Sequence, residues 1–300
     1  MAVVYYNESD SKILFGEQNI KILYVCKADN NQSIIPTAFH THDNHLEFQY
    51  ISDGSADIYI ENRLHKVKKG DVIVYNAGTA HDERADKEKG FKFYNFAIKD
   101  FKMLDLPKNH FLPPNISPVL HTGNMSESIQ NLFNEIYEQI SLKKNNGNSI
   151  CHYLLNALFI ILSEQIPHES IKKMTDMDFS FQQSKKYIDE NFRDESISID
   201  KLSEIAHMSV SGFSHLFKKL MGIAPVQYII RRRIGEAQKL LVTTDKSITD
   251  ISIEIGYDNV SHFNNQFKKF VGTSPQNYRK FWVSNEQFKK LNHIYNSIMI

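Results

Sequence analysis

The chain has 300 residues, of which 41% are hydrophobic and 23% charged, a composition that excludes disordered and fibrous proteins. Its 35 basic and 35 acidic side chains cancel, so it is not a uniformly basic nucleic-acid binder. The cancellation hides an asymmetry, because residues 180–283 carry 15 Lys and Arg against 11 Asp and Glu, and residues 1–179 carry 18 against 23. Only the last third is therefore expected to bind a polyanion.

Several kinds of segment are missing from the sequence. Cys26 and Cys151 are the two cysteines, too few for a disulfide framework or a zinc site built on C-x-x-C pairs. The first residues lack the basic and apolar regions of a signal peptide. The longest apolar run, residues 154–162, is far shorter than the roughly 20 residues of a membrane span. We therefore expect a cytoplasmic protein without a membrane segment.

Residues 20–100 alternate between apolar and polar side chains with a period of two. Short runs rich in β-branched and aromatic residues, such as EFQYI and DVIVY, are separated by turn pairs such as Asp53-Gly54 and Lys69-Gly70. Strands at roughly 8–12-residue spacing indicate a β-sandwich or a small barrel. We predict a β-domain over residues 1–110.

The apolar period becomes helical after residue 124. Apolar side chains recur at i, i+3 and i+4 behind Ser126, which is the expected N-cap. A second predicted helix, about residues 149–165, is apolar on nearly all sides and must be covered on several faces. We interpret residues 111–166 as a helical dimerisation segment, with a purely intrachain core helix as the alternative.

The last third of the chain repeats itself at an offset of fifty residues. HLFKKLMGIAP at residues 215–225 is echoed by NQFKKFVGTSP at residues 265–275. Each copy reads as a short helix, a three-residue turn and a second helix with one apolar stripe and one polar face, which is the pattern of a helix-turn-helix unit. We predict two such units in an all-α domain at residues 179–283, after a linker (167–178) and before a C-terminal tail (284–300).

Helix-terminating residues fall at equivalent places in both copies. Gly222 and Gly272 follow the polar-faced helices and suit a left-handed stop. The expected N-caps of the four short helices are Ser198, Ser209, Ser247 and Asp258.

The polar faces of the two second helices carry groups that can contact DNA. Asn side chains suit adenine in the major groove, and Lys and Arg neutralise phosphates. The alternative, a solvated surface without a partner, is disfavoured because the pattern occurs twice in the basic part of the chain. The predicted DNA-binding residues are Ser209, Ser211, Gly212, Ser214, His215, Lys218, Lys219, Arg231, Arg232, Asn259, Ser261, His262, Asn264, Asn265, Lys268 and Lys269.

The repeated region closely resembles the DNA-binding domain of the arabinose-regulator (AraC/XylS) transcription factors. Its most specific part is IGYDNVSHFNNQFKKFVGTSPQNYR at residues 255–279. The resemblance implies two helix-turn-helix units joined by a long helix, about residues 226–241, with the recognition helices in successive major grooves about 34 Å apart. Three departures from the family are Ala224, which replaces a capping residue before Pro225, Gly212, which lies early in the first recognition helix, and the lack of a base-facing Arg in either recognition helix.

The β-domain resembles a second family, the cupin barrels. His40, His42, Glu47 and Gly54 follow the pattern H-x-H-x4-E-x6-G, and Gly70, Asn76, Gly78 and His81 follow G-x5-N-x-G-x2-H. Asn76 stands where cupins usually have Pro. The resemblance implies that the four metal-binding positions, if a metal is bound, are His40, His42, Glu47 and His81.

Three functions of the β-domain remain open: a metal-dependent cupin enzyme, a sensor that holds a small effector, and a barrel that only packs and dimerises. Its fusion to this DNA-binding domain resembles the one-component sensors of the arabinose-regulator family, which favours the sensor. Strand aromatics, with Tyr5 and Tyr6 in an N-terminal arm, favour a sugar effector. The candidate effector-binding residues are His40, His42, Glu47, Gln49, Tyr59, His81 and Tyr94.

We therefore expect an α+β protein of two domains, an N-terminal cupin-like β-barrel (jelly roll) and a C-terminal all-α domain. It would be a homodimeric transcription regulator, an activator that binds double-stranded promoter DNA and a small-molecule effector and contacts RNA polymerase. No catalytic residue and no cofactor are expected, although a divalent metal in the barrel stays open. A metal-dependent cupin enzyme fused to a DNA-binding domain is the alternative.

Overall fold

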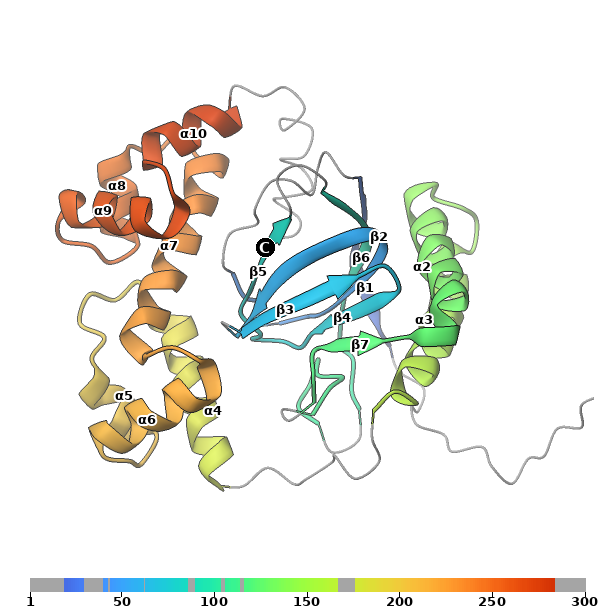
Figure 1. The fold of residues 1–300 in the computed structure, drawn as a ribbon, viewed down its shortest axis with the longest axis horizontal. Coiled ribbons are helices and arrows are strands. Elements are labelled where there is room, and N and C mark those ends of the chain that lie inside the picture. Colours follow the sequence, from blue (N-terminus) through green and yellow to red (C-terminus); the bar gives the residue numbers. More distant parts are fainter. Residues whose placement is uncertain are drawn as a thin grey trace, which may run out of the picture.

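The computed structural model describes residues 19–29, 40–42, 44–61, 63–85, 90–103, 106–113, 116–166 and 176–283. Tyr5, Tyr6 and the predicted tail lie outside these residues. The predicted organisation, a sheet-rich N-terminal domain and an all-α C-terminal domain, is confirmed. The β-domain lies between a helical pair on one side and the C-terminal helices on the other (Figure 1). No helix in the described part of the chain is long and apolar enough to cross a membrane.

The strands of the β-domain pair in antiparallel fashion, as the alternating sequence predicts. The order along the sheet is β1-β6-β2-β4-β7, and β3 and β5 pair with β2 outside this path. The strands are β1 (Lys21–Ala28), β2 (Leu46–Ile60), β3 (Arg63–Lys68), β4 (Asp71–Tyr75), β5 (His81–Ala85), β6 (Phe91–Lys99) and β7 (Val119–His121).

The long strand β2 belongs to two sheet regions. Its first half pairs with β4 and β6, and its second half pairs with β3 and β5. The pairing with β6 shifts register between Ile51 and Asp53. The next residue, Gly54, has a φ of +78°, and a Cβ there would lie 3.2 Å from the carbonyl oxygen of Gly90. Glycine is needed at this bend because any side chain would be strained and crowded.

Two helices, α2 (Ser126–Ser141) and α3 (Gly147–Ser163), cover one face of the sheet. They bury a core of aromatic rings, in which Phe48 of β2 stacks on Phe159 of α3 at 5.4 Å between centroids. Ser126 is not the N-cap, because the cap position is Met125 and no side chain caps the helix. The Ser126 hydroxyl instead lies 3.0 Å from the Tyr50 hydroxyl.

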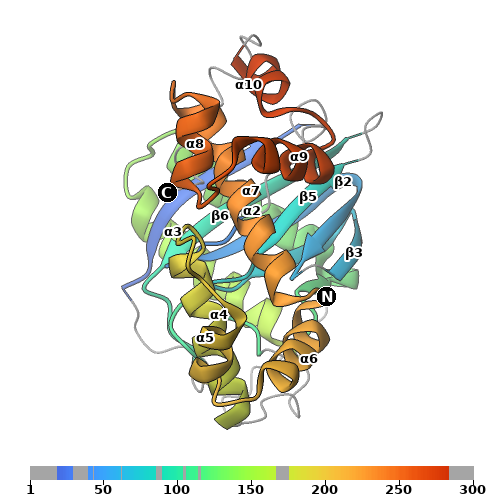
Figure 2. The ribbon, with the colours of Figure 1, turned by 90° about the vertical axis from the view of Figure 1, so that its left-hand side faces the viewer.

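The C-terminal domain consists of helices joined by short turns, with one helix-turn-helix unit at each end of the long helix α7 (Figure 2). The first helix, α4, begins inside the stretch predicted as a linker. The helices are α4 (Asp176–Asn191), α5 (Ile199–Ile205), α6 (Val210–Met221), α7 (Pro225–Thr243), α8 (Ile248–Glu254), α9 (Val260–Val271) and α10 (Pro275–Val283).

Caps define the ends of the helices in both units. Ser198, Ser209 and Ser247 accept hydrogen bonds from the backbone three residues on, as predicted. The prediction of Asp258 is wrong, since the N-cap of α9 is Asn259, whose side chain accepts from the amide of His262. Both α6 and α9 end at a left-handed glycine, as predicted.

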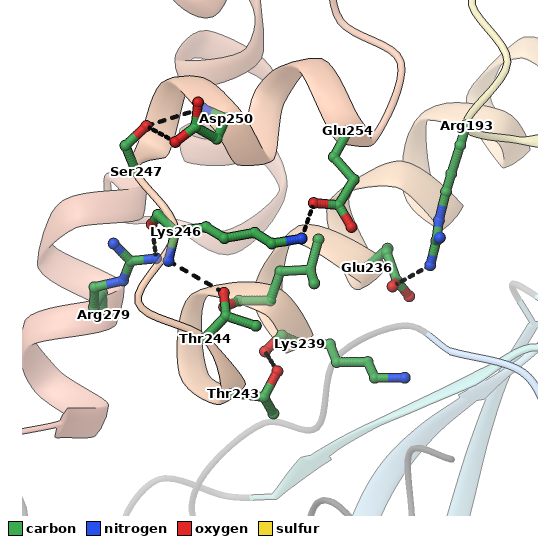
Figure 3. A network of polar contacts seen from close by, with 11 residues as sticks. Arg193, Glu236, Lys239, Thr243, Thr244, Lys246, Ser247, Asp250, Glu254 and Arg279 are labelled. Carbon is green, nitrogen blue, oxygen red and sulfur yellow. Dashed lines mark hydrogen bonds and ion pairs between the residues drawn. The ribbon is translucent and has the colours of Figure 1, made fainter.

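The helix α7 has 19 residues, about 28 Å at 1.5 Å per residue, and it binds both units. Arg279 of α10 donates to the carbonyl oxygen of Leu241 in the last turn of α7 (3.1 Å) and to that of Lys246 in the loop that follows it (2.7 Å). Glu236, nearer the middle of α7, pairs with Arg193 after α4 at 2.5 Å (Figure 3). These contacts set the spacing of the two units.

Candidate DNA-binding surface and histidine cluster

The two polar-faced helices, α6 and α9, present equivalent surfaces. Phe213 and Phe217 of α6 and Phe263 and Phe267 of α9 are fully buried, so the opposite faces are directed outward. The exposed residues on those faces are Ser211, His215, Lys218 and Lys219 on α6 and Ser261, His262, Asn265, Lys268 and Lys269 on α9, whereas Gly212, Ser214 and Asn264 are half-buried.

The first residue of each surface also caps its helix. The Ser209 hydroxyl accepts from the Gly212 amide at 3.2 Å, and the Asn259 amide oxygen accepts from the His262 amide at 3.0 Å. A Cβ at position 212 would lie 3.1 Å from the Ser209 oxygen, so the early glycine leaves room for the cap. Ser209 and Asn259 therefore have a structural role whether or not they contact DNA.

The arginines of α7 differ from the prediction. Arg232 was predicted to contact DNA, but it is only 8% exposed. Its Nε lies 2.9 Å from Asp189 Oδ1, and its guanidinium lies over the Phe192 ring at 4.9 Å. Burial and the ion pair leave Arg232 unavailable for phosphate, so its assignment is wrong for this conformation. Arg231 is half-buried, with its guanidinium 5.7 Å from the Phe270 ring.

The four cupin-like positions come together in the β-domain, as predicted. Glu47 Oε2 lies 3.5 Å from His42 Nε2 and 3.6 Å from His81 Nε2. The ring of His40 lies 4.7 Å from that of His42 and 4.2 Å from that of His81. We call His40, His42, His45, Glu47 and His81 the histidine cluster.

Backbone pairing and side-chain bonds position this cluster. The His40 amide donates to the carbonyl of His81 at 3.1 Å, and the His81 amide donates to the carbonyl of His40 at 2.9 Å. Glu47 Oε1 accepts from the Tyr24 hydroxyl at 2.8 Å and from the Asn95 side-chain amide at 2.5 Å. These two donors hold Oε1 so that Oε2 is directed at the histidines.

Three members of this arrangement were missed by sequence reasoning. His45 stacks on His42 with 4.2 Å between ring centroids, and Tyr24 and Asn95 orient Glu47. His45 and Glu47 are two apart, so strand alternation indicates that they share a face. No local signal identifies Tyr24 or Asn95, because β1 and β6 meet Glu47 only through the sheet pairing.

Two predicted effector-binding residues lie away from the histidine cluster. Tyr94 points to the helical side, where its hydroxyl donates to Asn134 of α2 at 2.9 Å, while its neighbour Asn95 reaches Glu47. Ile58 and Ile60 lie in one buried cluster with Tyr75, whose ring stacks on His81. Tyr59 is half-buried and alternates with these two isoleucines, so it lies on the other face of β2. Both assignments are corrected for this reason.

Gln49 reaches the cluster indirectly. It is fully buried and accepts from the Tyr75 hydroxyl at 3.1 Å. The Tyr75 ring stacks on His81 at 3.8 Å between centroids. Gln49 and Tyr75 therefore support one side of the cluster.

Burial keeps His42 and His81 neutral. It lowers the pKa of His42 well below its usual value, with further lowering from His40, His45 and His81. Burial likewise lowers the pKa of His81 to about 4, against a raising effect of its bond to the Thr79 carbonyl. Neutral imidazoles are the form that binds transition metals and accepts hydrogen bonds.

The residues present fit a divalent transition metal. His42 Nε2 and Glu47 Oε2 are buried and have no hydrogen-bond partner among the described residues. The ligand atoms of His40, His42 and His81 lie within 4.8 Å of one another, as do those of His42, His45 and Glu47. An imidazole and carboxylate set of this kind suits Fe, Mn or Zn. The same atoms could equally receive the hydroxyl groups of a small polar ligand.

Comparison with known protein families matches the two domains separately. Residues 202–280 match a family described as a helix-turn-helix domain, and residues 25–150 match one described as an AraC-like ligand binding domain. The first contains α6 and α9, and the second contains the whole histidine cluster.

Relatives cover much of the chain. It is 31% identical over 220 residues to the uncharacterized HTH-type transcriptional regulator YdiP of Escherichia coli, covering 72% of each protein. It is 27% identical to the lactose operon transcription activator of Staphylococcus xylosus, over 69% of this chain and 73% of that protein. It is 23% identical to the melibiose operon regulatory protein of Escherichia coli, over 86% of this chain and 95% of that protein.

One solved structure has a similar fold over most of the chain. Unsaturated fatty acid bound ToxT from Vibrio cholerae aligns with a TM-score of 0.50 and 14% identity, covering 89% of this chain and 97% of that one. At that identity the likeness concerns the fold alone. With both of its domains matched and a relative above 30% identity over most of its length, the chain belongs to the AraC family of transcriptional regulators.

Proposed function

We propose that this regulator is a homodimeric activator that binds promoter DNA with both helix-turn-helix units and responds to a small polar effector, a sugar, at the histidine cluster. The observation that carries the DNA-binding part is the pair of outward polar faces on α6 and α9, which have side-chain N-caps at equivalent positions, a glycine C-cap, a buried Phe pair and a terminal Lys pair in each helix. The DNA contacts would come from the exposed residues of these faces, without Arg232.

The effector part is supported by the chemistry of the cluster. Hydroxyl groups of a sugar would find acceptors and donors in His42, Glu47 and His81. Leaving such groups buried without partners costs about 1–3 kcal/mol each, so a ligand that pairs them is stabilising. Two relatives are named for the lactose and melibiose operons, which supports a sugar as the effector.

The dimer is supported by the outward face of α3. Ile150, Tyr153 and Ile160 are 38%, 74% and 46% exposed, and their spacing of three and seven residues puts them in one stripe. A second copy packed against this stripe would bury it. Dimerisation would bring a second DNA-binding domain to neighbouring half-sites at high effective concentration.

The activator role is supported by a relative named as an operon transcription activator. An activator bound beside a promoter would contact RNA polymerase. A reporter gene placed under a promoter that the protein binds should rise in expression when the protein is produced, and a fall would identify a repressor.

A second candidate function is a metal-dependent reaction at the histidine cluster, favoured by the convergent imidazoles and carboxylate. Here the bound metal would supply Lewis acidity, and Tyr24 and Asn95 would hold Glu47 in its orientation. Metal analysis of the purified protein distinguishes the two, because a stoichiometric transition metal together with turnover of a small substrate would favour the enzyme.

The test of the effector proposal is a thermal-shift screen of the full-length protein against sugars and other small metabolites. A ligand that binds only the native state raises the melting temperature, by mass action. The same ligand should fail to stabilise the Glu47→Ala variant. A sugar that stabilises both proteins equally binds elsewhere, and a screen in which only non-sugars act would remove the sugar assignment.

A further inference from the structure

The β-domain and the DNA-binding domain are joined by a buried ion pair. Lys185 of α4 is 6% exposed, and its ammonium donates to the carbonyl oxygen of Gly78, in the turn between β4 and β5. The same nitrogen lies 3.6 Å from Glu61 Oε1, in the turn between β2 and β3, and 3.0 Å from Asp189 Oδ2 on its own helix. The charge of Lys185, on a helix of the C-terminal domain, thus contacts two turns of the β-domain.

This ammonium is held in its charged form. Burial alone would lower the pKa of Lys185, but the charges of Asp189 and Glu61 outweigh it, and the pKa lies well above its usual value. A buried ion pair that loses one partner leaves an uncompensated charge, which is strongly destabilising. The contact between the domains is therefore specific to these partners.

Ala80 adds an apolar contact at the same place. It is fully buried in a cluster whose other members, including Phe181, Ile188 and Phe217, belong to the C-terminal domain. Two hydrogen bonds hold Ala80 next to Glu61. The Glu61 amide donates to the Ala80 carbonyl at 2.7 Å, and Glu61 Oε1 accepts from the Ala80 amide at 3.1 Å. The turns of the β-domain thus complete the core of the neighbouring domain.

A second contact reaches the recognition helix itself. The Arg63 guanidinium of β3 donates to the carbonyl oxygens of Lys219 (3.2 Å) and Leu220 (3.1 Å), in the last turn of α6. These are carbonyls that a helix end leaves unsatisfied, and a cation there is favourable. DNA phosphates beside Lys219 would approach the end of α6 to which β3 is tethered.

On its other side, the contact is joined to the histidine cluster. The Gly78 amide donates to the carbonyl of His42 at 2.8 Å, and His81 Nδ1 lies 2.9 Å from the Thr79 carbonyl oxygen. Residues 78–81 therefore run from the ammonium of Lys185 to the imidazole of His81. A ligand that displaces His42 or His81 would also displace this segment.

We propose that Glu61, Arg63, residues 78–80 and Lys185 form an interdomain lock that holds α6 against the β-domain and lowers the affinity of the protein for DNA. The inference rests on the proposed function, because it regulates the same DNA-binding surface. Release of the interdomain lock frees the first recognition helix to enter the major groove together with the second.

The first experiment measures binding of the full-length protein to a random-sequence duplex at low salt, by fluorescence anisotropy. Loss of a positive charge ordinarily weakens binding to a polyanion. The interdomain lock predicts the opposite for Arg63→Ala, namely a gain in affinity for DNA. We expect Arg63→Ala to bind about fivefold more tightly than wild type, the lower end of typical coupling between sites. Lys66→Ala, an exposed change on the same strand, should bind no more tightly than wild type.

An Arg63→Ala variant that binds DNA no more tightly than Lys66→Ala would overturn the interdomain lock. If neither the wild type nor any variant binds duplex DNA, the proposed function fails, and the second experiment alone decides whether the two domains are locked.

The second experiment needs no DNA. It compares amide hydrogen exchange in full-length Lys185→Met with wild type. Asp189 keeps Tyr228 (2.8 Å) and Arg232 as partners, so the helical domain should stay folded. The amides of Gly78 and Ala80, in the other domain, should exchange several-fold faster, and those of β6 should not change.

Lys186→Met is the matched control for hydrogen exchange, since Lys186 is exposed and pairs with Glu190 on the same helix. It should leave the amides of residues 78–80 as they are in wild type. A Lys185→Met variant that also leaves them unchanged would show that Lys185 acts only within its own domain and would overturn the interdomain lock.

Discussion

Asn265 and Lys269 lie on the same exposed face of α9 but offer DNA different chemistry. An Asn side chain can bond adenine in a bidentate way, whereas a Lys ammonium neutralises a phosphate of any sequence. We therefore expect Asn265→Ala to weaken binding to a cognate site by about 1–3 kcal/mol and to relax base preference. Lys269→Ala should weaken binding to cognate and random DNA by the same factor.

Titration of both variants against both duplexes checks this assignment. The salt dependence of binding should also become shallower for Lys269→Ala, because one fewer phosphate is neutralised. If Asn265→Ala loses as much affinity for random DNA as for the cognate site, Asn265 does not read bases.

His42 Nε2 and Glu47 Oε2 are buried atoms of the histidine cluster that lack a hydrogen-bond partner among the described residues. Replacing either residue by Ala should abolish the thermal shift produced by an effector of the wild-type protein, because the ligand loses its partner. Affinity for DNA in the absence of effector should remain measurable in both variants. Tyr94→Phe is the control, since the Tyr94 hydroxyl bonds Asn134 outside the cluster. A retained effector response in Glu47→Ala would move the effector site elsewhere.

At the scale of single elements, the N-cap of α9 can be tested against the neighbouring residue that the sequence favours. Asn259 caps the helix, and Asp258 precedes it. Removing an N-cap side chain destabilises a helix by about 0.5–2 kcal/mol. Asn259→Ala should therefore lower the free energy of unfolding by about 1 kcal/mol in denaturant titrations, and Asp258→Ala should change it much less. The reverse order would favour Asp258 as the cap.

The helix α3 has one buried and one exposed apolar face. Cys151, Leu155, Leu158 and Phe159 lie in the core, and Ile150, Tyr153 and Ile160 face outward. If a second copy covers this stripe, Ile160→Glu would place a charge in the dimer interface at large cost. Sedimentation equilibrium should then show a monomer for Ile160→Glu. Glu164→Ala, one turn further along, should leave the association unchanged.

At the scale of the whole molecule, opposite charge is distributed between the two domains. The C-terminal domain carries the basic excess and the Lys pairs of α6 and α9. Binding of the full-length protein to DNA should therefore fall steeply between low and physiological salt. An affinity that does not change with salt would contradict the assignment of Lys218, Lys219, Lys268 and Lys269 to phosphates.

Much of the molecule could be predicted from the sequence because its signals are local. The glycine stops and three of the four caps depend on residues within one turn of each other, and the fifty-residue repeat can be seen by aligning the sequence with itself. The period of two in the β-domain identifies which residues of one strand share a face, so His40 and His42 could be paired by spacing alone. The resemblance of these motifs to those of cupin barrels then implied that His40 and His42 meet Glu47 and His81.

Other features required the tertiary structure, because they join residues that no spacing rule connects. Register across β6 and β1 brings Asn95 and Tyr24 to Glu47 and turns Tyr94 towards α2. The docking of α4 buries Arg232 beside Asp189 and removes it from the DNA-binding face. The contact of Lys185 with Gly78 spans 107 residues. Local patterning determines which face a side chain occupies, whereas its partner depends on how strands and helices pack, which is set by the whole chain.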